Sequence, residues 1–255
     1  MWSAVSEPSV TWSRSAEGVD SGLLSTAGHA YSLLVVCSAW ALDGRPAADL
    51  TTRAQIRNAA IAVFAEEGFD ASFRSIAARV GVSPGLITHH FGSKEGLRAE
   101  CDAEVLRQYT AVKIDAVDRP TQHLVSYLIA PGFAASLVVY ILRAIHAGGQ
   151  PARDFLERLI DNVRGVMAYS VESGMVRPSR DEEARLRYMT YLTVGALLVQ
   201  FVTSPGRTPE EFIASIQAGQ QDQILPTLEL FTEGFLADRA VLDDYLTYIH
   251  DRTKE

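Results

Sequence analysis

Cysteine is scarce in this sequence, which has only Cys37 and Cys101 among its 255 residues. Two cysteines cannot form the set of cross-links on which small secreted domains depend. A chain of this length buries roughly 70–75% of the surface that its unfolded form exposes, so its core needs neither disulfides nor a metal ion. A reduced, cytoplasmic location is therefore the simplest expectation.

Basic residues are outnumbered, with 23 Lys and Arg against 31 Asp and Glu and a formal net charge of −8. This excess of acid argues against a generally basic nucleic-acid binder of the histone-like kind. The charge is unevenly distributed, however, because residues 50–99 carry +2 while residues 1–49 carry −3 and residues 100–255 carry −7. The pattern indicates a mildly basic module on an acidic body, whose acidic flanks disfavour non-specific DNA binding.

Long, purely apolar runs are also missing. Two stretches lack charged residues, 120–142 and 188–206, but both contain polar side chains, and the first has a central Pro131-Gly132. A membrane-spanning helix needs about 20 consecutive, mostly apolar residues. We therefore expect no membrane segment, and we expect both stretches to be helices buried in a core or a subunit interface.

The N-terminal 49 residues lack the basic region that precedes the core of a signal peptide. Residues 33–42 are apolar enough to resemble such a core, but the only basic residue before them is Arg14. We expect residues 1–49 to be an extension that is disordered or that results from a misassigned start codon.

Alternation of apolar and polar residues, which is typical of half-buried strands, is not convincing anywhere in the chain, whereas helical spacing recurs throughout. The first helix is expected to open at Thr52, with Gln55 completing a capping box, and to end at Gly68. The pattern as a whole predicts an all-α fold. Further helices are expected to begin after Ser72, at Pro84 and at Ser93, and then to cover 121–147 with a kink at Pro131, 151–173, 179–203, a short segment from Thr208, and a last helix or broken pair over 223–250.

The segment from Phe73 to Phe91 has the pattern of a helix-turn-helix, two short helices joined by a tight turn. Ile76, Val80, Val82 and Ile87 are the apolar residues that join the two helices. Gly81 lies at the turn, where a left-handed backbone is favourable only without a Cβ atom. Ser83 caps the second helix and Pro84 occupies its first position, so that free N–H groups point outward and favour phosphate.

At these residues the sequence resembles the tetracycline-repressor-like (TetR) family of bacterial regulators. The match runs over about 51–98 and includes Ile76-Ala77-Ala78, Gly81-Val82-Ser83 and residues 90–97, His-Phe-Gly-Ser-Lys-Glu-Gly-Leu. The resemblance implies a three-helix helix-turn-helix DNA-binding domain over 50–98 and a larger helical domain for ligand binding and dimerisation over 99–255. It further implies a transcriptional regulator, most simply a repressor, that binds a palindromic operator as a homodimer and is released by a small molecule.

The resemblance also assigns roles to individual residues. Gly85, Leu86 and Thr88 occupy positions that face base edges, and His89 lies where an aromatic residue usually touches the DNA backbone or a thymine methyl group. His90 matches the common histidine of the family. Lys94 matches the phosphate-binding lysine of the family. Phe73 and Thr88 depart from the common Thr and Tyr, which bears on the operator sequence and not on the fold. The candidate DNA-binding residues are Thr51, Arg53, Arg74, Ser83, Pro84, Gly85, Leu86, Thr88, His89, His90 and Lys94.

The C-terminal half offers candidates for the dimer and for the ligand pocket. By resemblance, helices over 180–203 and 223–248 pack against their symmetry mates as a four-helix bundle, and the uncharged stretch 188–202 suits that interface. A ligand pocket is expected to be mostly apolar with a few polar groups. The candidate polar anchors are His123, Arg143, His146 and Arg164.

Other classes of function fit the sequence less well. The alternative is an effector-free dimer that binds DNA or protein without small-molecule control. Residues 81–85 satisfy the G-x-S-x-G pattern of a hydrolase, but that pattern requires a strand before the serine, and a helix is expected there. His89 and His90 point about 100° apart on a helix and have no partner at zinc spacing. We therefore expect no enzyme, no metal site and no cofactor.

Overall fold

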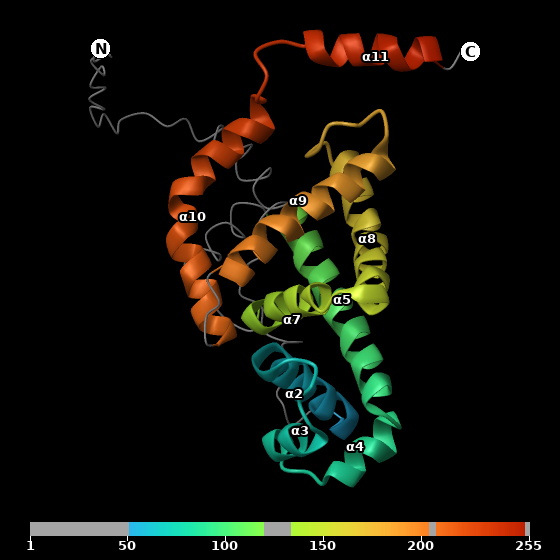
Figure 1. Cartoon of the computed structure of the whole chain (residues 1–255), viewed down its shortest axis with the longest axis vertical. Coiled ribbons are helices and arrows are strands. Elements are labelled where there is room, and N and C mark those ends of the chain that lie inside the picture. Colours follow the sequence, from blue (N-terminus) through green and yellow to red (C-terminus); the bar gives the residue numbers. More distant parts are fainter. Residues whose placement is uncertain (1–50, 120–133, 204–207, 253–255) are drawn as a thin grey trace, which may run out of the picture.

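The computed structural model describes residues 51–119, 134–203 and 208–252, and within them the chain is helical without strands. The predicted all-α fold is confirmed. The expected extension over residues 1–49 and the expected kink at Pro131 lie outside the described residues. Figure 1 shows α2, α3 and α4 gathered at one end of the molecule, with α5 leading away from them into the rest of the chain.

The end that the sequence predicts to bind DNA is built from α2 (Thr52–Glu67), α3 (Phe73–Val80) and α4 (Pro84–Phe91). Their apolar faces meet in a core that includes Ile56, Phe64, Ile76, Ile87 and, from α5, Leu97. Each of the three helices begins at a hydroxyl cap, and the predicted caps at Ser72 and Ser83 are confirmed. The capping box at Thr52 is wrong by one residue: Thr51 is the cap, and its hydroxyl accepts from the N–H of Ala54 at 3.3 Å.

The larger, C-terminal part starts with α5 (Lys94–Asp118), which begins beside the recognition helix and runs on without a break. The helices α7 (Ala134–His146), α8 (Gly149–Glu172) and α9 (Glu182–Thr203) pack against it or against each other. One buried cluster reaches from α2 to α10, including Phe64, Tyr140, Phe155 and Phe212. The two parts therefore share a continuous core.

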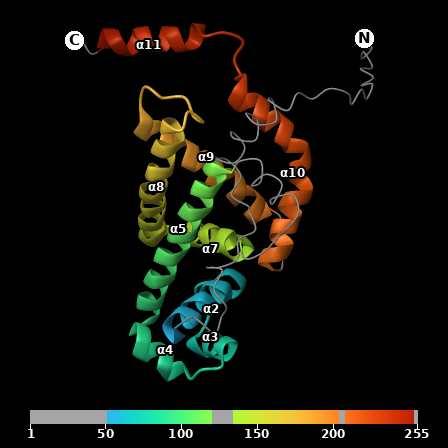
Figure 2. The same ribbon diagram turned by 180° about the vertical axis from the view of Figure 1, so that it is seen from behind.

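The last two helices differ from the sequence prediction. The sequence predicted a short helix at Thr208 and a last helix or broken pair over 223–250. In the structure, α10 (Pro209–Thr232) runs for 24 residues and contains Pro226 within it, and α11 (Ala240–Arg252) follows after a turn. Gly234, with φ +91°, lies in that turn. Pro226 does not end α10, although proline normally breaks or kinks a helix. Figures 1 and 2 show α10 along one flank and α11 standing apart from the body.

Candidate DNA-binding site

The turn between α3 and α4 has the geometry that the sequence predicts. Gly81 adopts a left-handed conformation with φ +76°, and its N–H donates to the carbonyl of Ala77 at 2.9 Å. The N–H of Val82 donates to the same carbonyl at 3.1 Å. Ser83 then accepts from the N–H of Leu86 at 3.3 Å, so its side chain is the N-cap of α4. This serine follows a helix, and the hydrolase interpretation, which needs a strand there, does not fit.

The recognition helix α4 buries one face and exposes the other. Ile87 and Phe91 are buried in the core, and Leu86 is partly buried against it. Gly85, Thr88 and His89 are exposed, as are Ser83 and Pro84 at the N-terminus of the helix. Of the three residues predicted to face base edges, Leu86 is therefore the most buried.

The N-termini of α4 and α5 and the side chains of Lys94 and Arg74 belong to this end of the molecule. Besides α4, α5 begins here at Ser93, whose hydroxyl accepts from the N–H of Gly96 at 3.1 Å. Helix N-termini carry partial positive charge and favour phosphate. Lys94 is the first residue of α5 and is half-buried, whereas Arg74 is exposed near the start of α3. Neither side chain forms an ion pair with the described part of the chain.

Arg53 is engaged within the protein. Its guanidinium donates to the carbonyl oxygen of His90 and to Glu100, the latter at 2.7 Å, and lies 4.5 Å from the centre of the Phe91 ring. These contacts join the start of α2 to the end of α4 and to α5. Thr51 is likewise engaged as the cap of α2. Both residues position the module, whatever contact they make with phosphate.

Two further contacts hold α3 and α5 in place. Arg79 pairs with both carboxylate oxygens of Glu66, one at 2.7 Å, and this hydrogen bonding raises the pKa of Arg79 above its ordinary value. Gly96 allows α5 to pass the end of α4, because a Cβ atom on it would lie 2.3 Å from the carbonyl oxygen of Phe91. Sequence reasoning included Gly96 in the family motif but gave it no role, because its neighbour is a backbone atom that no side-chain pattern reveals.

The joint to the larger domain runs through Arg143 on α7. Its Nε donates to the carbonyl of Ala65 at 2.8 Å and its Nη2 donates to that of Glu66 at 3.0 Å. These carbonyls belong to the last turn of α2, which leaves such groups without partners in its own helix. Burial lowers the pKa of Arg143 below its ordinary value. The sequence analysis offered Arg143 as a ligand anchor, but the structure uses it to couple α7 to α2.

A cavity of about 380 Å³ lies in the larger domain, between α5, α8, α9 and the end of α10. None of the described candidate anchors, Arg143, His146 and Arg164, lines it, and His123 lies outside the described residues. The basic residues that do line it are Lys113, Arg177 and Arg185. Sequence reasoning missed these three, because nothing in the local pattern distinguishes them from exposed cations.

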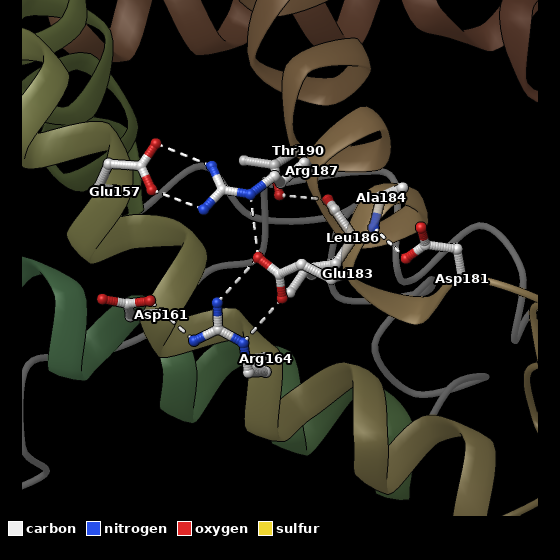
Figure 3. A network of polar contacts seen from close by, with 9 residues as sticks. All are labelled: Glu157, Asp161, Arg164, Asp181, Glu183, Ala184, Leu186, Arg187 and Thr190. Atoms are coloured by element: carbon white, nitrogen blue, oxygen red, sulfur yellow. Dashed lines mark hydrogen bonds and ion pairs between the residues drawn. The ribbon is translucent and has the colours of Figure 1, made fainter.

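An ionic network braces the α8–α9 pair beside this cavity (Figure 3). Arg187 on α9 binds both carboxylate oxygens of Glu157 on α8 at 2.8 Å, and also Glu183 at 3.0 Å. Arg164 joins Glu183 at 3.0 Å to Asp161 at 2.8 Å. Arg187 lies next to Leu186, which lines the cavity. The network therefore holds one cavity wall against its neighbour and explains Arg164 without a ligand.

Among the described residues, no group of three or more His, Cys, Asp or Glu side chains is placed to hold a metal ion. In the same parts of the chain, every helix is too short or too polar to cross a bilayer.

Two family models match the chain. The model of bacterial regulatory proteins of the tetR family matches residues 56–101, and the model of the tetracyclin repressor-like C-terminal domain matches residues 133–237. Among solved structures, FadR from Bacillus subtilis in complex with stearoyl-CoA matches 72% of this chain and 99% of its own at 18% identity and a TM-score of 0.48. A putative TetR-family regulator from Rhodococcus sp. matches 68% and 97% at 21% identity and a TM-score of 0.47.

Curated relatives match as well. The HTH-type transcriptional regulator UidR of Escherichia coli is 49% identical over 47 residues, which are 18% of this chain and 24% of UidR. The HTH-type transcriptional regulatory protein RaaS of Mycobacterium tuberculosis is 39% identical over 202 residues, which are 78% of this chain and 93% of RaaS. With both family models matched and a relative of this identity covered almost end to end, the chain belongs to the TetR family of DNA-binding transcriptional regulators.

Proposed function

We propose that this regulator is a repressor that binds a palindromic operator as a homodimer and is released when a small molecule enters its C-terminal domain. The observation that carries the proposal is the Arg143 joint, which ties the domain containing the cavity to the helices that present the recognition face. In this proposal residues 50–98 read DNA and residues 99–255 bind the ligand and the second copy. The protein acts in the cytoplasm, where the operator lies.

The proposed DNA contacts fall into two groups. The residues that enter or border the major groove are Ser83, Pro84, Gly85, Leu86, Thr88, His89 and His90. The exposure of Gly85, Thr88 and His89 supports this. Lys94 and Arg74 bind phosphate, supported by the absence of an ion pair for either within the described residues. The side chains of Thr51 and Arg53 already bind groups within the protein, so any phosphate contact that they add must be compatible with those hydrogen bonds. Phosphate contacts position the module, and the exposed face of α4 specifies the sequence.

The proposed homodimer uses an apolar stripe on α9. The stripe consists of residues spaced three or four positions apart, which therefore share one face of the helix: Tyr188, Leu192, Gly195, Val199 and Val202. Tyr188 is 66% exposed and Val199 is 63% exposed in the single chain. A second copy would cover this stripe and the exposed apolar residues of α10. It would also place two recognition helices on half-sites about 34–36 Å apart.

The proposed release works through coupled helices. The cavity touches α5, whose first turn packs against α4, and it touches α9, which packs against α7. A ligand that shifts either helix changes the relative positions of α4 in the two copies. The coupling requires that the ligand bind the released state more tightly than the DNA-bound state.

Fluorescence anisotropy with a labelled duplex from the region upstream of its own coding sequence tests the DNA-binding part. We expect salt-dependent binding, with Lys94→Ala weakening it and lowering the salt slope by about 1, since one phosphate contact is lost. Thr88→Ala is expected to weaken specific binding while leaving the salt slope nearly unchanged.

Arg119→Ala, at the far end of α5, is the matched control and is expected to bind as the unchanged protein does. Unaltered binding by both Lys94→Ala and Thr88→Ala contradicts the proposed interface. Binding that no small molecule reverses supports the effector-free alternative.

A further inference from the structure

The cavity in the C-terminal domain combines an apolar wall with positive charge. Much of its apolar surface comes from five side chains: Val163, Val166, Met167, Met189 and Val194. Among the described residues that line it, the charged ones are all basic: Lys113, Arg177 and Arg185. A volume of about 380 Å³ is at the lower end of the range for small-molecule pockets and suits one compact ligand.

Arg185 brings an unsatisfied donor to this cavity. Its two terminal nitrogens donate to the Arg177 carbonyl and to Glu182, whereas its Nε is buried and has no hydrogen-bond partner within the described structure. A buried N–H without a partner costs free energy, so native proteins seldom leave one. A ligand that places a hydrogen-bond acceptor beside this Nε would satisfy the donor.

Lys113 adds a second positive group from α5. Its side chain is only 4% exposed, and its ammonium lies 5.4 Å from the centre of the Tyr109 ring, which also lines the cavity. Burying a charge is costly unless it is compensated by a partner. An anion in the cavity would provide further compensation. Lys113 also lies on the same helix as Lys94, about 28 Å along its axis, so its contacts bear directly on the DNA-binding end.

We propose that the cavity binds a molecule with an apolar body and one acidic group, a carboxylate or a phosphate. The acidic group accepts from Arg185 Nε and faces Lys113, and the apolar body lies against the Met and Val side chains. The proposal rests on the proposed function, since it names the chemistry of the effector. A neutral alcohol of the same shape can accept from the Nε donor but brings no negative charge to face Lys113, and a cationic molecule adds repulsion.

Isothermal titration calorimetry with four molecules of equal chain length tests this chemistry. Decanoate and decyl phosphate carry the acidic group, decanol is neutral, and decylamine is cationic. We expect at least one of the two acids to bind about tenfold or more tightly than decanol, because hydrogen bonds to a charged group discriminate by at least that factor. Decylamine is expected to bind most weakly. The two acids distinguish a carboxylate effector from a phosphate effector.

Variants locate the effect in the cavity. Arg185→Met and Lys113→Met are each expected to reduce the preference for acid over decanol, while decanol binding persists. Arg153→Met, which removes an exposed cation on α8 outside the cavity, is the control and should keep the preference. Thermal unfolding checks that each variant is folded, and if Arg185→Met is not, Lys113→Met carries the test.

Equal binding of decanol and both acids, no binding of either acid below its aggregation concentration, or an unchanged preference in folded variants overturns the proposal. Failure of the wider function gives a different result. If an acid binds with the expected preference yet leaves DNA binding unchanged, the ligand chemistry stands and the effector role is wrong.

Discussion

At the scale of single residues, the geometry of the recognition helix depends on Gly96. This glycine lies in the first turn of α5, where the helix passes the end of α4. The neighbouring atom is the Phe91 carbonyl oxygen, which belongs to the backbone and cannot turn away as a side chain does. Gly96 therefore allows α4 and α5 to meet closely enough for Arg53 to bind the end of α4.

Gly96→Ala is expected to destabilise the protein by about 1–3 kcal/mol, as overpacked cores do, and to weaken DNA binding about tenfold or more. The cause is the added Cβ atom, which would lie 2.3 Å from the Phe91 oxygen and so force α4 to move. Urea unfolding and anisotropy on operator DNA measure the two effects. Gly165→Ala on α8 is the control. The added Cβ atom meets open space, so we expect the free energy of unfolding to rise by about 0.5–1 kcal/mol. Normal DNA binding by Gly96→Ala would show that α4 tolerates the shift.

At the scale of elements, α2 and α7 form the joint between the DNA-binding end and the larger domain. Arg143 from α7 satisfies two carbonyls at the end of α2, and Phe64 of α2 packs near Tyr140 of α7, with ring centres 6.4 Å apart. Tyr140 in turn donates to Asp102 of α5 at 2.6 Å, and Asp102 accepts from Arg158 of α8 at 2.8 Å. These contacts connect α7 with α2 and α5 and, through Asp102, with α8.

Arg143→Met is expected to lower the free energy of unfolding by about 1–3 kcal/mol, because two carbonyls in a half-buried place lose their donors. Hydrogen exchange should increase in the last turn of α2 and in the residues that follow it. Arg153→Met, which removes an exposed side chain that donates to Gln150 on the same helix, is the matched variant and should change stability little. Equal stability of the two variants would mean that packing alone holds the joint.

At the scale of the whole molecule, the apolar surface that the single chain leaves uncovered is concentrated on α9, α10 and α11. The α9 stripe is joined by Leu225 and Leu230 on α10, and α11 has no buried residue. Soluble chains seldom expose so much contiguous apolar surface without a partner. A homodimer through these helices accounts for it, and it matches the need for two recognition helices on one operator.

Val199→Asp places a charge in the middle of the α9 stripe and is expected to shift the protein from dimer to monomer, because burying an unpaired carboxylate is costly. Sedimentation velocity measures the change, and operator binding should fall with it. Gly165→Asp adds the same charge on α8, away from the stripe, and should leave the dimer intact. A protein that remains dimeric after Val199→Asp would place the interface elsewhere.

Much of the DNA-binding end could be predicted from the sequence because its determinants are local. Ser72, Ser83 and Gly81 act on their own helix ends, within a few residues of chain, and each is where the pattern predicts. The last two helices were predicted less well. The helix that was expected to be short at Thr208 continues through Pro226 to Thr232 as α10.

The sequence by itself determined the helix-turn-helix, the all-α fold and, through its motif, the TetR family, since caps, turns and helical periodicity are encoded in short segments. Only the tertiary structure decided the roles of Arg53, Gly96 and Arg143. Arg53 contacts Glu100, which lies 47 residues away along the chain, and Arg143 contacts Ala65, which lies 78 residues away. Gly96 lies only five residues from Phe91, but its contact is with a backbone oxygen. It also decided which cations line the cavity. The physical reason is that a cation looks the same in sequence whether it faces solvent, a helix end or a ligand, and only packing distinguishes the three.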